Sequence, residues 1–390
     1  MAIKVQRRHF LLSSALLGLS VKSDAVTFSP VQDNTGSVKV GTAKSQTSNV
    51  AYIAASKSPL GESSLVCLDH QMMVIAEHDI DARGHSFARS NAGHIAAIAR
   101  RPSDFCLVLN SLGEKIVEFQ AQENRHFYGH GVYSACGHYL YLTENDYAYS
   151  GTRGVIGVYD AQDNYRRINE LSTFGVGPHE IALSGDGEQL IIANGGIETH
   201  PQTGRKKLNL KIMQPSLVHI DRDTGALIHQ SSLEAEYRGN SIRHIAQASD
   251  GRVYLGLQKQ AGHSESSLVA FFSPESKTLK TLPLTTKIQS KLNDYVGDIC
   301  LDSSGKYLAV SSPKGDALVL INLKQNNAQL VHINGVCGLA SVTGYENQFI
   351  ASTGEGKLWL IDVNNRSVTH TLIVDSLGSK RWDNHILSIS

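Results

Sequence analysis

The chain has 390 residues, and its 36 Lys and Arg are balanced by 36 Asp and Glu, so the formal net charge at pH 7 is zero. Proteins that bind nucleic acids or acidic membranes carry clustered Lys and Arg, whereas the longest such run here is Arg205-Lys206-Lys207. The composition therefore argues against a nucleic-acid partner, while the length allows a large core in one domain or two.

Residues 1–25 have the layout of a removable export signal. Basic residues precede an apolar stretch over 10–21, which is too short to span a bilayer, and small residues at 23–25 offer a cleavage site. Arg7-Arg8 resembles the centre of a twin-arginine signal, with an ordinary secretory peptide as the alternative. We expect a monomer exported to the periplasm by the twin-arginine route, with a linker over 26–48 and no transmembrane segment.

The five cysteines do not suggest a disulfide framework. Their number is odd, and most of them lie inside apolar runs: Cys67, Cys106, Cys136, Cys300 and Cys337. Buried single thiols are the common outcome of such a pattern. The chain has no C-x-x-C-H motif, which excludes covalent haem attachment.

From Val50 onward, short runs of Val, Ile, Leu and Tyr alternate with Gly, Asn and Asp turns, which predicts an all-β fold. One unit recurs along the chain: a first strand, a Ser/Asp-Gly turn, a second strand, a loop, and a third strand that ends in Asp or Asn. Its first half is visible in "GHSFARSNAGHIAAIAR" and "RHIAQASDGRVYLGLQ", and its third strand in "ALVLIN" and "KLWLID". The units start roughly 40–65 residues apart, which is the spacing of four-stranded propeller blades.

The two ends of the repeat region complement each other. Residues 51–80 supply three strands of a unit that lacks its first strand, and "RWDNHILSIS" (381–390) is a lone first strand. Joining them makes a seventh blade and closes the ring, which removes the free strand edges that invite aggregation. The sequence therefore predicts a seven-bladed β-propeller over 49–390 whose ends share the closing blade, with a pair of β-sandwiches as the alternative.

One position near the start of each first strand carries a side chain of a metal-ligating type. First strands line the channel of a propeller, so we expect these side chains to meet at a single cavity. The seven positions are His85, His130, His179, His244, Asp298, Cys337 and His385. Imidazole, carboxylate and thiolate all bind transition metals, which makes the ring a candidate site for iron, copper or non-covalent haem. Two other interpretations stay open: a histidine acting as general base in an enzyme, and a channel that is polar for packing reasons alone.

A long insertion at 193–217 separates two strands of the third unit. Long loops on propellers usually sit over one mouth of the channel and carry recognition. We expect polar side chains in this loop and beside the ring to hold a ligand: Asn194, His200, Arg205, Asn209, Glu180 and Arg243. The alternative is a surface loop ordered by its own contacts. The chain has no serine-nucleophile elbow, phosphate-binding loop or dinucleotide motif, which disfavours serine hydrolysis and nucleotide chemistry.

Four segments carry a family resemblance: "STFGVGPHEIAL", "ANGGIETHPQTGRKKLNLKIMQPSL", "SIRHIA" and "WDNH". Through them the chain resembles the twin-arginine-exported bacterial propellers classed as domain of unknown function 1513. The resemblance implies a periplasmic accessory to iron or haem handling, with an imelysin-like lipoprotein or a dihaem cytochrome-type protein as partner. The matching motif positions are His179, Glu180, the 194–216 loop, Arg243, His244, Cys337, Asn384 and His385. The family supplies no established catalytic residue.

Taken together, the repeats and the resemblance predict a propeller whose histidine-rich channel mouth binds a metal ion, haem or an iron complex, as a non-catalytic partner in iron acquisition. Two alternatives remain. One is an oxidoreductase or a lactonase-like hydrolase that works at the same mouth. The other is a scaffold that docks a protein partner and binds no ligand.

Overall fold

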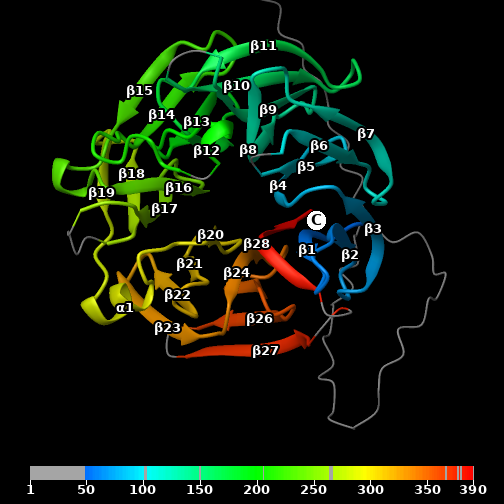
Figure 1. Cartoon of the computed structure of the whole chain (residues 1–390). Helices are drawn as coiled ribbons and strands as arrows, with labels where there is room; N and C mark the ends of the chain where they lie inside the picture. The colour runs from blue at the N-terminus through cyan, green and yellow to red at the C-terminus, as the bar shows by residue number, and fades with distance from the viewer. Residues whose placement is uncertain are drawn as a thin grey trace, which may run out of the picture. The chain divides into compact units, whose positions relative to one another are not determined.

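The computed structural model describes residues 49–100, 103–148, 151–204, 206–262, 267–364, 367–375, 377 and 380–389. The predicted export signal and linker over 1–48, and Arg205 in the long loop, lie outside these residues. Within them, the strands form seven antiparallel sheets of four strands each. Figure 1 shows the sheets around a common centre, so the predicted seven-bladed β-propeller is confirmed.

Each blade runs from an innermost strand at the channel to an outermost strand at the rim. In that order, blades 1 and 2 are β4 (Gly84–Arg89), β5 (Ile95–Ala99), β6 (Phe105–Leu109), β7 (Lys115–Gln120), and β8 (Arg125–Tyr133), β9 (Tyr139–Asp146), β10 (Arg153–Asp160), β11 (Arg166–Ser172). Blades 3 and 4 are β12 (Pro178–Leu183), β13 (Gln189–Asn194), β14 (Ser216–Asp221), β15 (Leu227–Ser231), and β16 (Asn240–Gln247), β17 (Val253–Lys259), β18 (Val269–Ser273), β19 (Thr278–Thr281). Blades 5 and 6 are β20 (Asp298–Leu301), β21 (Tyr307–Ser312), β22 (Ala317–Asn322), β23 (Asn327–His332), and β24 (Val336–Ser341), β25 (Gln348–Thr353), β26 (Leu358–Val363), β27 (Val368–Val374). Blade 7 is β28 (Arg381–Ser388), β1 (Tyr52–Lys57), β2 (Ser63–Leu68) and β3 (Val74–Ile80).

The two middle strands of a blade are apolar on both faces because each sheet packs against its neighbours on both sides. In blade 5, every residue of β21 and β22 is buried. Strands covered on both faces read as continuous hydrophobic runs rather than as strict alternation. The outermost strands differ: in β7 exposed and half-buried residues alternate from Ile116 to Gln120, as expected for a strand with one face in water.

The two ends of the described chain pair with each other in blade 7. Strand β28 runs antiparallel to β1, with Ile53 opposite Leu387 and Tyr52 opposite Ser388. In Figure 1 the red C-terminal strand lies directly beside the blue N-terminal one. This pairing closes the ring as predicted and leaves no inner strand of blade 7 unpaired.

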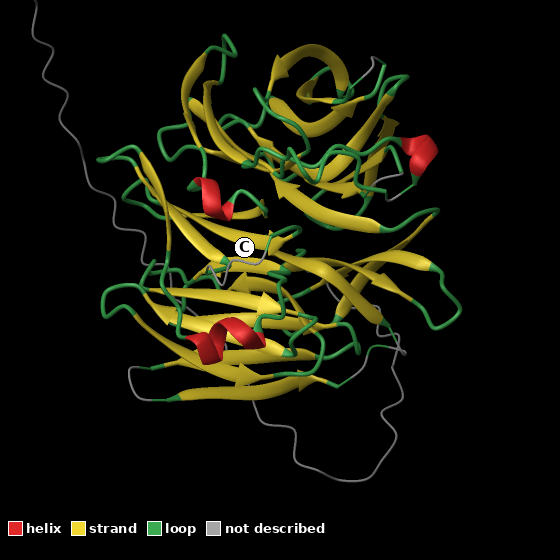
Figure 2. Ribbon diagram, turned by 60° about the vertical axis from the view of Figure 1, so that its left-hand side comes forward, coloured by secondary structure: helices red, strands yellow, loops and turns green. Residues whose placement is uncertain are grey.

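Helical structure is confined to short connections, as Figure 2 shows in red. The described helices are α1 (Thr286–Lys291) and two single 3-10 turns, η1 (Pro201–Thr203) and η2 (Ala235–Tyr237). Thr285 caps α1, because its side chain accepts a hydrogen bond from the Ile288 amide. Among the described residues, no helix has the length and apolar character needed to cross a bilayer.

All five cysteines are free thiols. Cys67, Cys106 and Cys337 are buried as expected, whereas Cys136 is exposed in the turn between β8 and β9.

Candidate metal centre

The inner strands share a feature that alignment of the repeats does not show. In six of the seven, the pairing with the second strand of the blade is interrupted by a register shift. In β12, for example, the register passes from Pro178 to Glu180 and leaves His179 outside the ladder. The shifts in the other strands fall at or beside the positions of His85, His130, His244, Cys337 and His385. Only Asp298, in β20, sits in an unshifted pairing. A bulge releases a side chain from the regular pleat and redirects it, and bulges are common beside functional sites.

The five imidazoles of the ring come together in one buried group, which we call the histidine cluster: His85, His130, His179, His244 and His385. Each of these residues is at most 5% exposed. Six pairs of these rings have centroids 4.7–5.0 Å apart. The centroids of His85 and His179 lie 5.8 Å apart, and those of His130 and His244 lie 6.0 Å apart. Side chains up to 300 positions apart in the sequence, such as His85 and His385, therefore share one site.

Several Nδ1 atoms of the cluster face oxygen atoms. His179 Nδ1 lies 3.1 Å from the carbonyl oxygen of Arg243, and His244 Nδ1 lies 3.1 Å from Glu180 Oε2. His385 Nδ1 lies 3.2 Å from Asp298 Oδ1. A carbonyl oxygen can only accept, so the proton of His179 is on Nδ1 and its Nε2 carries a lone pair.

Other ring nitrogens in the cluster have no hydrogen-bond partner among the described residues. These are His244 Nε2 and His385 Nε2, together with His85 Nδ1, which lies 4.0 Å from Asp383 Oδ1. His130 Nε2 lies 3.2 Å from His85 Nε2, and His130 Nδ1 lies 3.7 Å from Glu180 Oε2. A buried polar atom left unpaired costs about 1–3 kcal/mol. These unpaired nitrogens therefore destabilise the fold unless a bound ligand or water pairs with them.

Burial decides the protonation of the site. It lowers the pKa of His85, His130, His179 and His244 well below the ordinary value, and nearby Arg100, Arg243 and the other histidines lower it further. Burial also raises the pKa of Glu180 well above its usual range, and the Asp298 carboxylate adds to the effect. These four imidazoles are therefore neutral at pH 7, which is the form that binds metal ions.

Three overlapping groups of side chains place their ligand atoms within 4.8 Å of one another. They are His130, His179, Glu180 and His244; His85, His130 and His385; and His244, Asp298 and His385. Glu180 joins them from the position next to His179, and its side chain is 20% exposed. Glu180, predicted from its place beside the ring, thus lies in the same cluster as the histidines.

Cys337 stands on the ring but belongs to none of these groups. Its Sγ lies 3.4 Å from Ser352 Oγ and 3.2 Å from the carbonyl oxygen of Asp383, so the thiol bridges blades 6 and 7. Burial raises the pKa of this thiol to about 12. At neutral pH this thiol is therefore protonated and hydrogen-bonded to its neighbours.

The predicted ligand residues of the long loop are not brought to the cluster by any described contact. Asn194 is fully buried and donates to the Thr173 carbonyl oxygen and to Ser216 Oγ. Asn209 Oδ1 accepts from the Glu198 amide, and its Nδ2 donates to the Gly196 carbonyl oxygen. His200 caps η1 by accepting from the Gln202 amide. These contacts order the loop.

Sequence reasoning missed two residues that shape the site. Gly129 has φ of 102°, and a Cβ there would lie 2.4 Å from Cδ2 of His85, so only glycine lets blade 2 approach this imidazole. Asp383 lies beside His85, and its Oδ2 pairs with the Arg83 guanidinium. The "GHG" context of His130 and the "WDNH" motif were the only signals in the sequence for these two positions.

Comparison with solved structures finds similar propeller-sized chains. One, titled Kuenenia stuttgartiensis Hydrazine Synthase, is 14% identical with a TM-score of 0.57, over 86% of this chain and 99% of that one. Another, a functionally unknown protein from Desulfotomaculum acetoxidans, is 12% identical with a TM-score of 0.55, over 87% of this chain and 100% of that one. At these identities the likeness shows the fold alone.

No curated protein sequence matches the chain. A family described as "Protein of unknown function (DUF1513)" matches residues 78–389, which span six complete blades and the closing strand. The chain belongs to this family.

Proposed function

We propose that the channel of this propeller binds transition-metal ions through the histidine cluster. The observation that carries the proposal is the pairing of the ring nitrogens: in His244 and His385, Nδ1 faces a carboxylate oxygen while the buried Nε2 has no partner among the described residues. Metal-bound histidines are held in this manner, with the other ring nitrogen donating to a carboxylate or a backbone carbonyl. His179, whose Nδ1 donates to a carbonyl oxygen, follows the same pattern.

The charge of the site suits a cation. Neutral imidazoles offer lone pairs without first losing a proton, and a buried metal ion needs negative partners. Glu180 and Asp298 supply two carboxyl groups within the same groups of ligand atoms, and a bound cation would lower the raised pKa of Glu180 and favour its carboxylate form. Asp298 is itself held in place, because its oxygens accept from the amides of Ile299 and Leu339.

The ligand set favours some metals over others. Imidazole nitrogen and carboxylate oxygen suit iron, copper, zinc and nickel, and the site offers no ready thiolate to select a softer ion. A tetrahedral ion takes four ligands, whereas the cluster holds five imidazoles. Because the three groups share His130, His244 and His385, a second ion would share ligands with the first.

The same packing argues against haem as the ligand. The imidazole rings contact one another edge to face at centroid distances of 4.7–4.9 Å. A flat porphyrin that takes axial histidines must lie between them, which here requires the inner strands to separate. We therefore propose ions, or an iron complex that releases its ion, rather than intact haem.

For the biological role, we propose a periplasmic accessory function in iron acquisition, with an imelysin-like lipoprotein or a dihaem cytochrome-type protein as partner. This part of the proposal rests on the signal-like Arg7-Arg8 segment and on the family resemblance. The histidine cluster supplies the metal-binding capacity that such a role needs.

The test is metal binding by stripped protein. Elemental analysis of natively exported protein and competitive titration with Fe(II), Cu(II), Zn(II) and Co(II) give the stoichiometry and the preferred ion. We expect His244→Ala or His385→Ala to weaken binding by about 100-fold, the size of effect seen when metal sites lose a supporting group. His219→Ala is the matched control, since His219 is buried in β14 outside the cluster. Absence of tight binding, or equal losses in the control, would refute the proposal.

A further inference from the structure

A pocket of about 600 Å³ lies at blade 3, beside its boundary with blade 4, and shares no residue with the histidine cluster. Its volume falls within the range of small-molecule sites, roughly 300–1,000 Å³. The walls come from three segments: residues 174–176 before β12, Gly196 with 209–216 from the long loop to the first residue of β14, and 230–238 from the end of β15 to the turn before β16. All three lie at the end of the blade where the inner strands begin, so the pocket opens on the same face as the bulged histidine positions.

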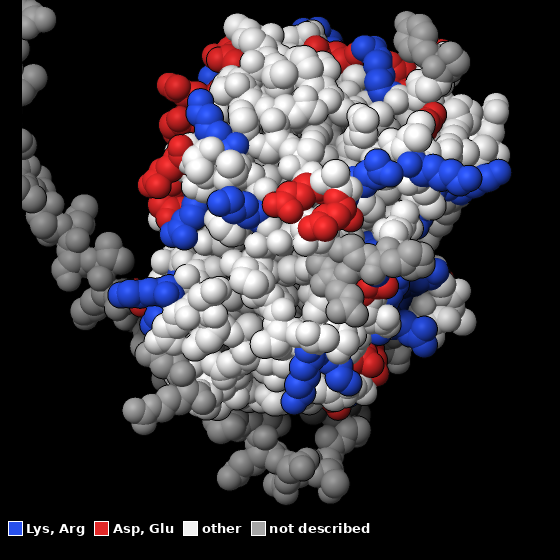
Figure 3. Space-filling view, turned by 90° about the vertical axis from the view of Figure 1, so that its left-hand side faces the viewer, with Lys and Arg blue, Asp and Glu red and all other residues white. Residues whose placement is uncertain are grey.

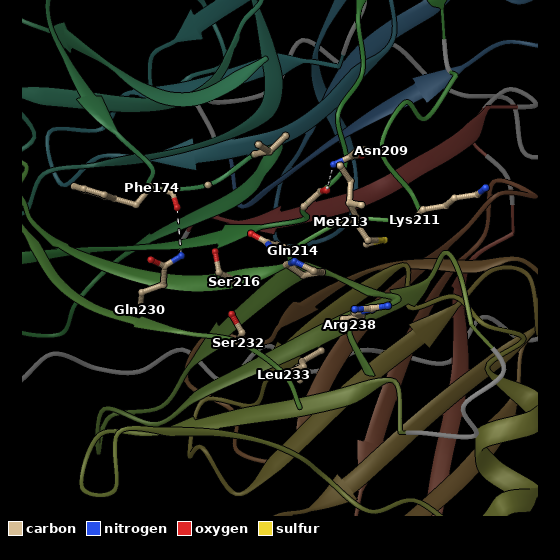
Figure 4. Close-up of a pocket in the computed structure, with 15 residues that line it drawn as sticks. Phe174, Asn209, Lys211, Met213, Gln214, Ser216, Gln230, Ser232, Leu233 and Arg238 are labelled. Carbon is tan, nitrogen blue, oxygen red and sulfur yellow. Dashed lines mark hydrogen bonds between the residues drawn. The ribbon is translucent and has the colours of Figure 1, made fainter. Parts of the chain in front are cut away.

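The charged groups of this pocket are of one sign. Lys211 and Arg238 are the charged side chains in its lining, and no Asp or Glu belongs to it. Neither cation forms an ion pair with another residue in the part of the chain that the structure describes. Figure 4 shows both side chains toward one end of the pocket and Phe174 with Gln230 toward the other. On the face shown in Figure 3, small groups of both charges lie between large uncharged areas, in keeping with the balanced composition of the chain.

The lining also carries apolar side chains, some of which are open to solvent. Phe174 is 40% exposed and Ile212 is 76% exposed, while Met213 and Leu233 are buried. Phe174 also has φ of 52°, a left-handed conformation that is rare for a bulky residue and costs about 1–3 kcal/mol. Its carbonyl oxygen is held by Gln230 Nε2. Strained residues of this kind concentrate at ligand sites.

We propose that this pocket binds a small organic anion, with a carboxylate at Lys211 and Arg238 and an apolar, preferably aromatic, body against Phe174 and Ile212. Arg and Lys recognise carboxylates through charge-assisted hydrogen bonds. The amide of Gln214 and the hydroxyl of Ser232 lie between the two ends and provide further polar contacts (Figure 4). The site is independent of the proposed metal centre.

The test uses 2-naphthoate and its neutral analogue 2-naphthamide as a matched pair of probes. The chain contains four methionines, and Met213 lines the pocket whereas Met72 belongs to blade 7. Methionine methyl groups labelled with carbon-13 therefore report the binding site directly by NMR on metal-free, full-length protein. We expect 2-naphthoate to shift the Met213 methyl signal through the ring current, with Met72 and Met73 unchanged and with 2-naphthamide at least about tenfold weaker.

Substitutions then assign the anion end. We expect Arg238→Gln or Lys211→Gln to weaken 2-naphthoate by about tenfold and to leave 2-naphthamide unaffected. Lys280→Gln, on the exposed face of β19, is the control and should change neither. The unchanged Met72 and Met73 signals verify that each variant is folded. Equal binding of the two probes would overturn the anion assignment, and the absence of a Met213 shift at millimolar 2-naphthoate would overturn the site.

Discussion

Replacing His244 by leucine separates a functional cluster from a structural one, because the two accounts predict opposite signs for stability. His244 is fully buried, with Nε2 unpartnered and Nδ1 bound to Glu180. Leucine has a similar size and no polar atom. If the cluster exists to bind metal, the metal-free protein should become more stable when this imidazole is removed, while metal binding is lost.

The magnitude follows from three contributions. Removing the unpaired Nε2 relieves about 1–3 kcal/mol, and losing the hydrogen bond from Nδ1 to Glu180 costs about 0.5–1.5 kcal/mol. Burying leucine in place of an imidazole that is already buried contributes only part of the roughly 1.5–3 kcal/mol that full burial of a leucine provides. Glu180 keeps a 20% exposed side chain and therefore reaches water after the change. An imperfect fit of leucine in a site shaped for a flat ring reduces the sum, so we expect a net gain of about 1–3 kcal/mol.

Urea unfolding in the presence of a chelator, followed by the fluorescence of Trp359 and Trp382, measures this change. The titration is repeated with the preferred metal at about 100 times its Kd, which should stabilise wild type by about 2.7 kcal/mol and His244→Leu by nothing. His219→Leu is the control, since His219 Nε2 is also buried without a partner. It should gain stability and keep the metal effect. A loss of more than about 1 kcal/mol in metal-free His244→Leu, with no metal effect in wild type, would refute the reasoning.

Three other outcomes are expected. Gly129→Ala places a methyl group 2.4 Å from His85 Cδ2, so the free energy of unfolding measured in urea should fall by about 2–4 kcal/mol and metal affinity should fall with it. Gly151→Ala is the control. This glycine has φ of 94° and nothing within 4 Å of its Cβ position, so the free energy of unfolding should fall by only about 1 kcal/mol. Burial, assisted by a nearby histidine, lowers the pKa of His219 to about 4, so stability present above about pH 6.5 should decline by about 3 kcal/mol as pH falls to 4. The decline should be smaller by that amount in His219→Gln, and identical pH profiles would contradict it. Cys136 is exposed and a serine hydroxyl lowers its pKa, so a thiol reagent should label one cysteine in the native protein and none in Cys136→Ser.

The fold was predictable because each blade repeats the same order of strands and turns, although the spacing between blades varies. The first three strands of a blade are apolar and bounded by Gly, Asn or Asp turns, and the lone strand at 381–390 revealed the closing blade. The outermost strands are harder to assign from sequence. In β7 every side chain is exposed or half-buried, so its hydrophobic pattern is too weak to mark a strand.

The candidate site was predictable as a ring of positions but not as a set of contacts. Equivalent positions in the repeat must face the channel, which is why five histidines could be named before their distances were known. The pairing irregularities that release these side chains depend on strand register, which short repeats leave undetermined. Cys337 is held by Ser352 and a carbonyl of the neighbouring blade, and only the packed structure brings these partners to it.

The sequence could not show whether the polar residues of the long loop face a ligand or bond to the protein itself. Asn194 and Asn209 are polar residues in a long loop, a pattern equally typical of recognition and of internal order. The structure shows that both are engaged in local hydrogen bonds. The pocket at Lys211 and Arg238 is assembled from three connections that are distant in sequence, so no local motif could predict it.

Anomalous diffraction from crystals of the protein loaded with its preferred metal tests the central claim most directly. Data collected on either side of the absorption edge of that metal locate each ion without assumptions about ligands. We predict a peak inside the channel, about 2.0–2.2 Å from the Nε2 atoms of His244 and His385 after small side-chain movements. A channel without any peak, with ions only at exposed histidines of the surface, would contradict the account.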